Sequence, residues 1–598
     1  MANSYKTEWN FSLLYNDEND PKIESDIAEV LKNSYLFVDK WKNREDYLCN
    51  ENILKEALDE YEKWARFYGC CSSQSYYFWL RLSVDQNNGN LKAKYNKIND
   101  ISTKIRNDIS FFELNLSKIN KNTQQLFLNS ELLNDYKNYL TNIFNNAKYW
   151  LSLKEENIIT LKNKTSFENW ANLMDELLSK EERTIFTGEM FESKNFSSII
   201  GEITNKNKNI RDSAFEAIND ILLKNSHIAE IEFNSILEDH RINKKIRGFE
   251  RFDSQRHLSD NISSNIVDSL INSVSSNFNI SREFYEIKAK LFGVEKLKYN
   301  ERSLEYGQIN KNYNYNESIN LIKETFKSID FDFYNILLEL LDGHIDVFPK
   351  KGKSDGAFCA TGSIENPVYI MLNHSNKLND VLTIAHECGH AINDYLMINK
   401  QNSLNFGNSL AIAEVASTFF EDFVLEKMLE KADDELRLTI MMMKLNGDIS
   451  TIFRQIAFYK FESEIHLNAS ENGYLSKKDI GFIFQKHMKD YMGDSIDHSS
   501  GTENWWIYVS HFRNPFYVYS YASGLLISKA MQNNLKKDTN FIFKIKKFLS
   551  AGTSKSPEDI FLDMGIDISN EKFWIDGISE ISNLLENTKE LAKKLGKI

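Results

Sequence analysis

Residues 381–392 read VLTIAHECGHAI, and this stretch decides how the rest of the chain is interpreted. Apolar residues surround two histidines and a glutamate, and no proline interrupts them, which predicts a buried α-helix. On a helix, His386 and His390 lie four residues apart and project from the same face, so both can reach one metal ion. Asp380 lies near the expected start of this helix, where a negative charge is favourable.

The pattern HExxH predicts a zinc site that activates water. Zinc lowers the pKa of bound water from about 15.7 to about 7. Glu387 follows the first histidine, and its carboxylate can take the proton of that water and pass it to a leaving amine. We therefore predict that Glu387 is the catalytic base. The alternative is an accidental HExxH, which is uncommon in a chain with 11 histidines.

A third protein ligand is required, with the fourth position left open for water. One class of zinc peptidases carries a glycine and a third histidine shortly after HExxH, but Asn393 and Leu396 occupy those places here. After the turn-rich residues 399–409, a second apolar helix is predicted, with Glu414 in its second turn. A carboxylate in such surroundings needs a partner, because burying it unpaired is costly. We predict that Glu414 is the third ligand of one zinc ion; an ordinary charge pair is the alternative.

Other polar residues near the motif have less certain roles from sequence alone. Glu421 and Asp422 lie two turns after Glu414, and either could accept the second N–H of a zinc-bound histidine. The more ordinary interpretation is that they are solvated or paired elsewhere, and Asp394 is ambiguous in the same way. His374 is more readily explained as a structural histidine than as a substrate contact.

The composition predicts a large helical protein. The chain has 598 residues, which is too many for one compact core, and only 5 prolines and 23 glycines interrupt it. Helical periodicity is present in residues 26–41 and 53–68 and continues to about residue 341, whereas residues 347–372 predict two short strands joined by a turn. We place a boundary near residue 200, between an N-terminal helical lobe (1–200) and a catalytic domain (201–598).

Charge and cysteine usage restrict the partners and the compartment. The formal net charge of -14 argues against nucleic-acid binding, which depends on basic faces. The five cysteines are odd in number, sparse and without a CxxC pair, so a disulfide framework is not expected. The longest uncharged stretch, 514–528, is too short and too polar to span a bilayer, and the first residues lack a secretory pattern. We therefore expect a cytoplasmic protein without a membrane partner.

Several ordered segments together resemble the oligoendopeptidase F branch of the thimet oligopeptidase family of zinc peptidases. They are GKSDGAFCATGSIENPVYIM (352–371), HECGH (386–390), AEVASTF (413–419), the His- and Tyr-rich residues 510–524, and a tail within residues 556–574. The resemblance covers roughly residues 200 to 590, with a weaker helical match before that. An ordered set of this kind is far more specific than HExxH alone.

The resemblance implies a mainly α, two-lobed zincin with a small β-sheet next to the zinc site and a deep substrate channel. It implies hydrolysis of internal bonds of short peptides. It also implies that a strand edge formed by Gly356, Ala357 and Phe358 aligns the substrate backbone, as in strand-addition recognition.

The resemblance further assigns oxyanion stabilisation to the C-terminal segment. His511, Tyr517 and Tyr521 are the candidate donors, and Tyr519 is a rival. Residues 509–510 are Val-Ser where the family often has a proline, and the spacing to the tyrosines shifts between branches, so the choice among the tyrosines stays open. An aromatic cluster that simply forms core is the alternative.

Two other functions remain possible from the sequence. A glutamate-liganded aminopeptidase or carboxypeptidase would share the zinc site, but the segment 356–359 (GAFC) lacks the acid that captures a free amine. A catalytically silent peptide-binding protein is disfavoured because all four residues needed for hydrolysis are present. Cleavage preference, and whether the chain is a monomer or a homo-oligomer, are left open.

Overall fold

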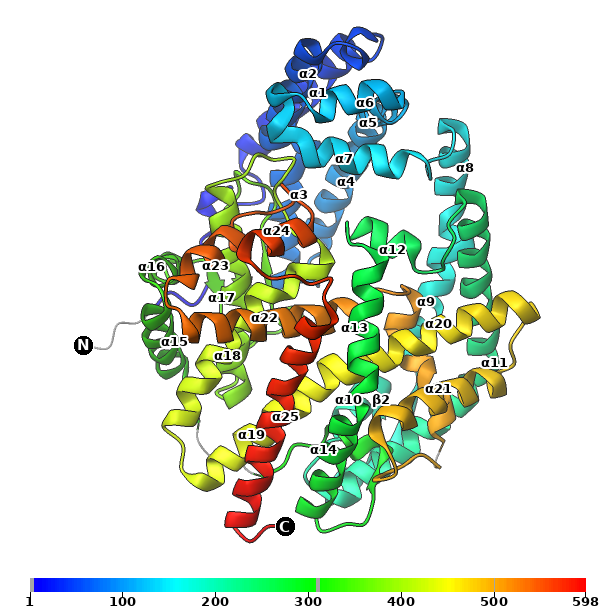
Figure 1. Cartoon of the computed structure of the whole chain (residues 1–598), viewed down its shortest axis with the longest axis vertical. Helices are drawn as coiled ribbons and strands as arrows, with labels where there is room; N and C mark the ends of the chain where they lie inside the picture. Colours follow the sequence, from blue (N-terminus) through cyan, green and yellow to red (C-terminus); the bar gives the residue numbers. More distant parts are fainter. Residues whose placement is uncertain (1–4, 308–311, 500) are drawn as a thin grey trace. The chain divides into compact units, whose positions relative to one another are not determined.

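A computed structural model describes residues 5–307, 312–499 and 501–598. The described chain is nearly all helical, with a few short strands, which confirms the predicted fold class (Figure 1). Many helices begin at an asparagine whose side-chain oxygen accepts a backbone N–H of the first turn, as Asn50, Asn88 and Asn120 do. The asparagine-rich composition therefore supplies helix caps, which stabilise each helix by about 1 kcal/mol.

The chain forms two compact units, each assembled from three segments. Unit 1 contains residues 1–148, 310–430 and 531–566, and unit 2 contains residues 149–309, 431–530 and 567–598. Segments of the two units alternate along the chain. The predicted division instead separates the chain into two parts at residue 200, and it stays a prediction.

Unit 1 contains the HExxH motif. Its elements are α1 (Pro21–Trp41), α2 (Glu51–Phe67), α3 (Ser72–Val84), α4 (Gly89–Ile109), α5 (Phe111–Ser117), α6 (Lys121–Leu128), α7 (Lys137–Ala147), α15 (Tyr315–Ile329), α16 (Phe331–Leu340), β4 (Ile345–Asp346), β5 (Phe358–Ala360), β6 (Tyr369–Met371), α17 (Leu378–Ile398), α18 (Leu410–Glu430), α23 (Phe541–Leu549) and α24 (Pro557–Met564). Helix α22 (Tyr519–Lys537) begins in unit 2 and ends in unit 1.

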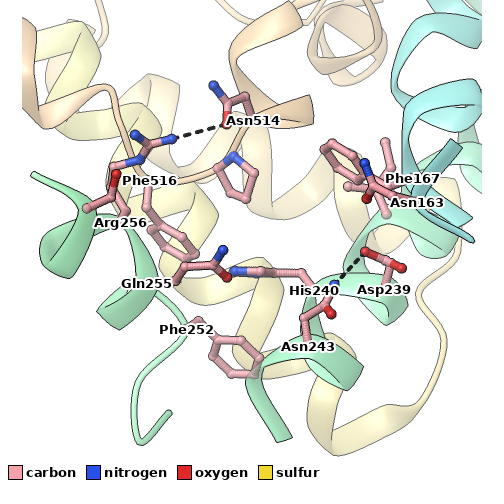
Figure 2. A pocket seen from close by; sticks show the side chains of 13 residues that line it. Asn163, Phe167, Asp239, His240, Asn243, Phe252, Gln255, Arg256, Asn514 and Phe516 are labelled. Carbon is pink, nitrogen blue, oxygen red and sulfur yellow. Dashed lines mark hydrogen bonds between the residues drawn. The ribbon is translucent and has the colours of Figure 1, made fainter. Parts of the chain in front are cut away.

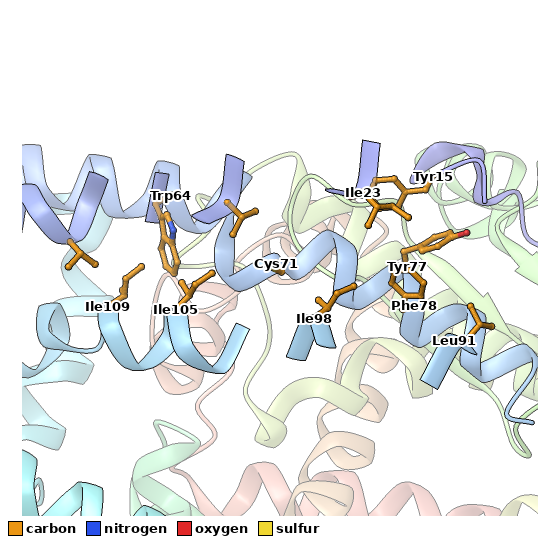
Figure 3. Packing of buried hydrophobic residues seen from close by; sticks show 12 residues of the cluster. Tyr15, Ile23, Trp64, Cys71, Tyr77, Phe78, Leu91, Ile98, Ile105 and Ile109 are labelled. Carbon is orange, nitrogen blue, oxygen red and sulfur yellow. The ribbon is translucent and has the colours of Figure 1, made fainter. Parts of the chain in front are cut away.

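The first helices of unit 1 share one apolar core. Trp64, Ile105 and Ile109 lie at one end of it, and Tyr77 and Leu91 lie at the other (Figure 3). Apolar residues spaced three and four apart on α1, α2 and α4 supply much of this core, as the periodicity predicted, and α3 supplies Tyr77.

A three-stranded sheet in unit 1 packs against α17. The strand order is β4-β6-β5, with β5 antiparallel and β4 parallel to β6. Phe358 pairs with Met371 and Ala360 pairs with Tyr369, which confirms the two strands predicted within 347–372. β5 is an edge strand of this sheet.

Unit 2 is also helical. Its elements are α8 (Leu153–Asn163), α9 (Asn169–Ser179), β1 (Glu182–Phe186), β2 (Phe191–Asn195), α10 (Phe196–Glu202), α11 (Lys208–Arg247), α12 (Ser254–Ser259), α13 (Ser264–Ser276), α14 (Phe278–Leu291), β3 (Leu297–Lys298), α19 (Asp434–Asp448), α20 (Arg454–Asn472), α21 (Lys477–Met492), β7 (Ile496–Asp497) and α25 (Glu571–Lys594). The β1–β2 hairpin was not predicted. Across the described residues of both units, helices long and apolar enough to cross a bilayer are absent.

Candidate metal centre and active site

The HExxH motif lies in the middle of α17, as predicted. The helix begins beside Asp380, whose carboxylate accepts hydrogen bonds from the backbone N–H groups of Ser375 and Lys377 at 2.7 and 2.9 Å. The helix then buries an apolar face that includes Val381 and Ala385. The capping and the buried face fix the position of α17, from which the two histidines project.

His386, His390 and Glu414 bring three ligand atoms together. Oε2 of Glu414 lies 3.4 Å from Nε2 of His386 and 3.8 Å from Nε2 of His390, and all three ligand atoms lie within 4.8 Å of one another. Zinc–ligand bonds of about 2.0–2.2 Å in a tetrahedron place ligand atoms roughly 3.3–3.6 Å apart. The donor types fit a zinc ion, the Glu414–His386 spacing falls within this range, and the Glu414–His390 spacing lies slightly above it.

Gly389 allows α18 to approach α17 closely enough for Glu414 to reach the histidines. A Cβ at position 389 would lie 2.7 Å from Cα of Ser417 and 2.9 Å from the carbonyl oxygen of Ala416. Because both atoms belong to the α18 backbone, a side chain there would push the two helices apart. Ser417 adds a hydrogen bond from its hydroxyl to Oε2 of Glu414, at 3.2 Å.

Glu421 supports the site from two turns further along α18. Its Oε2 lies 3.1 Å from Nδ1 of His386, the ring nitrogen that faces away from Glu414. A hydrogen bond there fixes the ring orientation and leaves Nε2 as the metal-binding atom. The more ordinary interpretation of Glu421 was therefore wrong, whereas it holds for Asp422, which is buried and accepts a hydrogen bond from Gln532 at 3.1 Å.

Glu387 is almost fully buried, with 7% of its surface exposed. Burial raises the pKa of its carboxyl to about 7, although a hydrogen bond from the backbone of Cys359 and the charge of His386 act in the opposite direction. The contact with Cys359 places Glu387 next to β5. A general base of this kind is most effective when its pKa lies near the working pH.

The charges of the ligand set are unequal. Burial alone would raise the pKa of Glu414, but the hydrogen bond with His386 and the two imidazole charges lower it to about 2. Burial lowers the pKa of His390 to about 4, and the neighbouring His386 adds to this effect. Burial would lower the pKa of His386 too, but its hydrogen bonds with Glu414 and Glu421 raise it to about 10, so this ring must lose a proton before Nε2 can bind a cation.

The predicted substrate-aligning residues lie at the start of edge strand β5. Asn373 donates hydrogen bonds to the carbonyl oxygens of Ser354 and Gly356, at 2.9 and 2.8 Å, and thereby holds the segment before the strand. Gly356 has a φ of +80°, and no heavy atom lies within 4 Å of the position of a Cβ, so open space adjoins it. Ala357 and Phe358 follow, both half-buried.

In unit 2, His511, Tyr517 and Tyr521 form one cluster. Nδ1 of His511 is hydrogen bonded to the hydroxyl of Tyr517, and the ring of Tyr521 lies 5.8 Å from each of the other two. The hydroxyl of Tyr519, in contrast, donates to buried Asp260 at 2.6 Å. Tyr517 and Tyr521 are half-buried and Tyr519 is fully buried, so the geometry favours the first two as donors.

A cavity of about 280 Å³ lies in the same unit, and its lining includes residues 514–516, which directly precede Tyr517 in the sequence. Figure 2 shows Phe516, the residue before Tyr517, on its wall together with Arg256 and Asn514, which are hydrogen bonded at 3.2 Å. On the opposite wall Asn243 donates to Asp239 at 2.8 Å.

Sequence reasoning missed two features of this centre, the packing role of Gly389 and the Cys359 backbone contact with Glu387. A glycine between the two motif histidines was a usable signal for close helix packing, since a glycine in a helix interior is otherwise unfavourable. The hydrogen bond between the Cys359 backbone and Glu387 could not be predicted, because it does not depend on the type of side chain at position 359.

The chain is similar to known peptidases in sequence and in fold. The sequence profile of peptidase family M3 matches residues 203–580, and that of oligopeptidase F matches residues 115–180. The oligoendopeptidase F homolog of Borreliella burgdorferi is 26% identical over 98% of both chains, and oligopeptidase PepF of Bacillus subtilis is 25% identical over 94% of this chain and 85% of its own. The crystal structure of oligoendopeptidase-F from Enterococcus faecium has a TM-score of 0.70 at 19% identity and covers 96% of this chain and 99% of its own.

Proposed function

This chain belongs to peptidase family M3 and is a metallo-oligopeptidase, and from that premise we propose which residues perform the hydrolysis. His386, His390 and Glu414 hold one zinc ion, and Glu387 is the general base. The substrates are short peptides cleaved at internal bonds. The convergence of both imidazoles on one carboxylate oxygen, at 3.4 and 3.8 Å, is the observation that carries the proposal.

His386, His390 and Glu414 would hold the zinc ion, which when bound would act as a Lewis acid, lowering the pKa of water to about 7 and polarising the carbonyl of the scissile bond. Glu421 fixes the His386 ring through Nδ1. Glu387 takes the proton of the attacking water and delivers it to the leaving amine, and its burial excludes bulk water from that transfer. The β5 edge from Gly356 to Phe358 holds the peptide backbone in an extended form.

Tyr517 and Tyr521 complete the proposal as donors to the oxyanion of the tetrahedral intermediate. The contact between His511 and Tyr517 orients the Tyr517 hydroxyl. We expect Tyr517→Phe to lower kcat by about 100-fold with little change in KM. Tyr519→Phe is the matched control: it removes a hydroxyl that bonds to Asp260 and should lower Tm rather than kcat.

The central experiment combines metal analysis with cleavage of an internally quenched peptide blocked at both ends. Wild type should carry about one zinc per chain and lose activity with a chelator. Glu387→Gln should keep the zinc and lose at least about 1,000-fold in kcat. Equal rates for the two proteins would show that Glu387 is not the base, and failure to cut blocked peptides would indicate an exopeptidase.

A cytoplasmic location is also part of the proposal. All five cysteines are unpaired in the structure, as is usual in proteins of reducing compartments. The acidic composition supports the expectation that nucleic acid is not a partner.

A further inference from the structure

Unit 1 also contains a cavity, of about 210 Å³, and part of its wall is formed by α17, the helix that carries the proposed metal centre. It is lined by Gly356 and Ala357 before β5, by Leu372, Asn373 and His374 after β6, and by Asp380, Thr383 and Ile384 on α17. An apolar cavity of about 150 Å³ can hold benzene, so this one has room for a branched or aromatic side chain.

The position of the cavity along α17 relates it to the reaction. Thr383 precedes His386 by three residues and Glu387 by four, so its side chain is their neighbour on the same helix face. Three residues correspond to about 4.5 Å along the helix axis. The cavity therefore begins about one helical turn from the metal ligand and the base.

Edge strand β5 determines what can enter. An extended peptide paired with β5 would point alternate side chains to the same side of the sheet, at a spacing of about 3.3 Å per residue. The open space at Gly356 leaves the backbone accessible where the cavity meets the strand. A side chain within two residues of the scissile bond is thereby brought to the cavity.

The lining is chiefly apolar, and its polar groups are already engaged. Leu372 and Ile384 are each 1% exposed. His374 is buried, accepts a backbone N–H at Nδ1 and lies 3.4 Å from the Ser318 hydroxyl at Nε2, and burial lowers its pKa, which keeps it neutral. Asp380 is occupied in capping α17, and its negative charge disfavours an acidic side chain.

We propose that this cavity is a specificity pocket that selects a large apolar side chain of the peptide, leucine or phenylalanine in size, within two residues of the cleaved bond. The inference rests on the proposed function, because it requires peptide hydrolysis at the centre on α17. Thr383 and Ile384 are the specificity-determining residues of α17.

The test is a peptide series with one varied position, scanned from two residues before to two residues after the cleaved bond. Wild type should favour leucine over glycine at one position by roughly 100-fold in kcat/KM, and should disfavour aspartate there. Thr383→Phe fills the cavity and should reduce the leucine-to-glycine ratio at that position to below about 5. Thr383→Ser should keep the wild-type ratio.

Asn399→Phe is the matched control, since it adds the same ring at the exposed C-terminal end of α17 and should keep the ratio. A wild-type preference for lysine or arginine at the position would overturn the inference, and so would an unchanged ratio in Thr383→Phe. If either result is obtained while a chelator still abolishes cleavage by the wild type, the specificity pocket is refuted but the proposed peptidase function is not. Absence of chelator-sensitive cleavage in wild type would instead refute the proposed function.

Discussion

Each unit contains a pair of histidines in edge-to-face contact, and the two pairs have nearly the same ring geometry. His386 and His390 have ring centroids 5.0 Å apart at 80°, and His240 and His466 have centroids 4.7 Å apart at 77°. The surroundings differ. The first pair meets the carboxylates of Glu414 and Glu421, whereas the second lies against aromatic rings.

The contrast shows that carboxylates, rather than the arrangement of the rings, distinguish the candidate metal centre. Nδ1 of His240 lies 3.2 Å from Nδ1 of His466, a spacing that two metal ligands could also have. Phe252 and Phe516 pack on His240 (Figure 2) and also on His466. Burial lowers the pKa of His240 to about 4. The charge of Asp253 acts to raise the pKa of His240, but the effect of burial is larger and keeps the ring neutral.

The largest effect is expected when the shared carboxylate is removed. Glu414→Ala leaves both imidazoles of α17 in place but makes the pair resemble that of unit 2. Bound zinc should fall well below one per chain, and peptide cleavage should fall by about 1,000-fold or more at micromolar zinc. Metal analysis after dialysis and a quenched-peptide assay measure both.

Glu426→Ala is the control for this change, because Glu426 lies on the same helix in a surface ion pair with Lys536. It should keep both zinc and activity. Retention of one zinc per chain in Glu414→Ala would mean that the carboxylate is not a ligand. Carboxylates would then not be what distinguishes the histidine pair of unit 1 from that of unit 2.

The next largest effect is expected from separating the carboxylate from the histidines without removing it. Gly389→Ala places a methyl group against the α18 backbone at Ser417 and Ala416, so Glu414 must move away. A displacement near 1 Å can lower activity by about 100-fold. Steady-state kinetics at saturating zinc, together with a zinc titration, would show this loss.

Gly447→Ala provides the comparison, since Gly447 is also in a helix but has no heavy atom within 4 Å of a Cβ position. It should retain activity and gain about 0.5–1 kcal/mol of stability. If both variants behave alike, close packing at Gly389 does not position the site.

The helix that carries HExxH and the strands beside it could be predicted because their signals are local. Two histidines four residues apart, a glutamate between them and an apolar helix follow from spacing alone, as do the two strands that include β5. Glu421 was not assigned because its contact with His386 depends on how α18 packs on α17, which no spacing rule fixes.

The parts of the fold that were not predicted have physical reasons too. The β1–β2 hairpin is exposed, and Ile185 is its one fully buried side chain, so it lacks the alternation of a half-buried sheet. The interleaving of the two units depends on contacts between segments hundreds of residues apart. Periodicity identifies the helices but not their partners.

A smaller effect is expected when the second carboxylate contact is weakened. Glu421→Gln can still accept one hydrogen bond from His386 but loses the negative charge. Zinc affinity should fall by about 10–100-fold, while kcat at saturating zinc changes less. Competition with a chromogenic chelator measures the affinity, and Glu426→Gln should give the wild-type value. An unchanged affinity in Glu421→Gln would show that this contact does not support the metal.

The smallest effect concerns the other histidine pair. Burial holds the pKa of His466 well below its usual range, whereas the unfolded chain titrates near 6.5. Between those values the unfolded state binds more protons, so stability falls as the pH drops below about 6.5. His466→Phe keeps a ring among Phe252 and Phe516 and removes this proton uptake.

Between pH 7.5 and pH 5.5, wild type should therefore lose about 1 kcal/mol more unfolding free energy than His466→Phe. Urea unfolding followed by fluorescence, with chelator present in every sample, measures the difference without a contribution from bound metal. His227→Gln, at an exposed position on α11, should show the wild-type pH dependence. Equal losses in wild type and His466→Phe would mean that the unit 2 pair is not held neutral by burial, and that both pairs could carry charge or bind a cation.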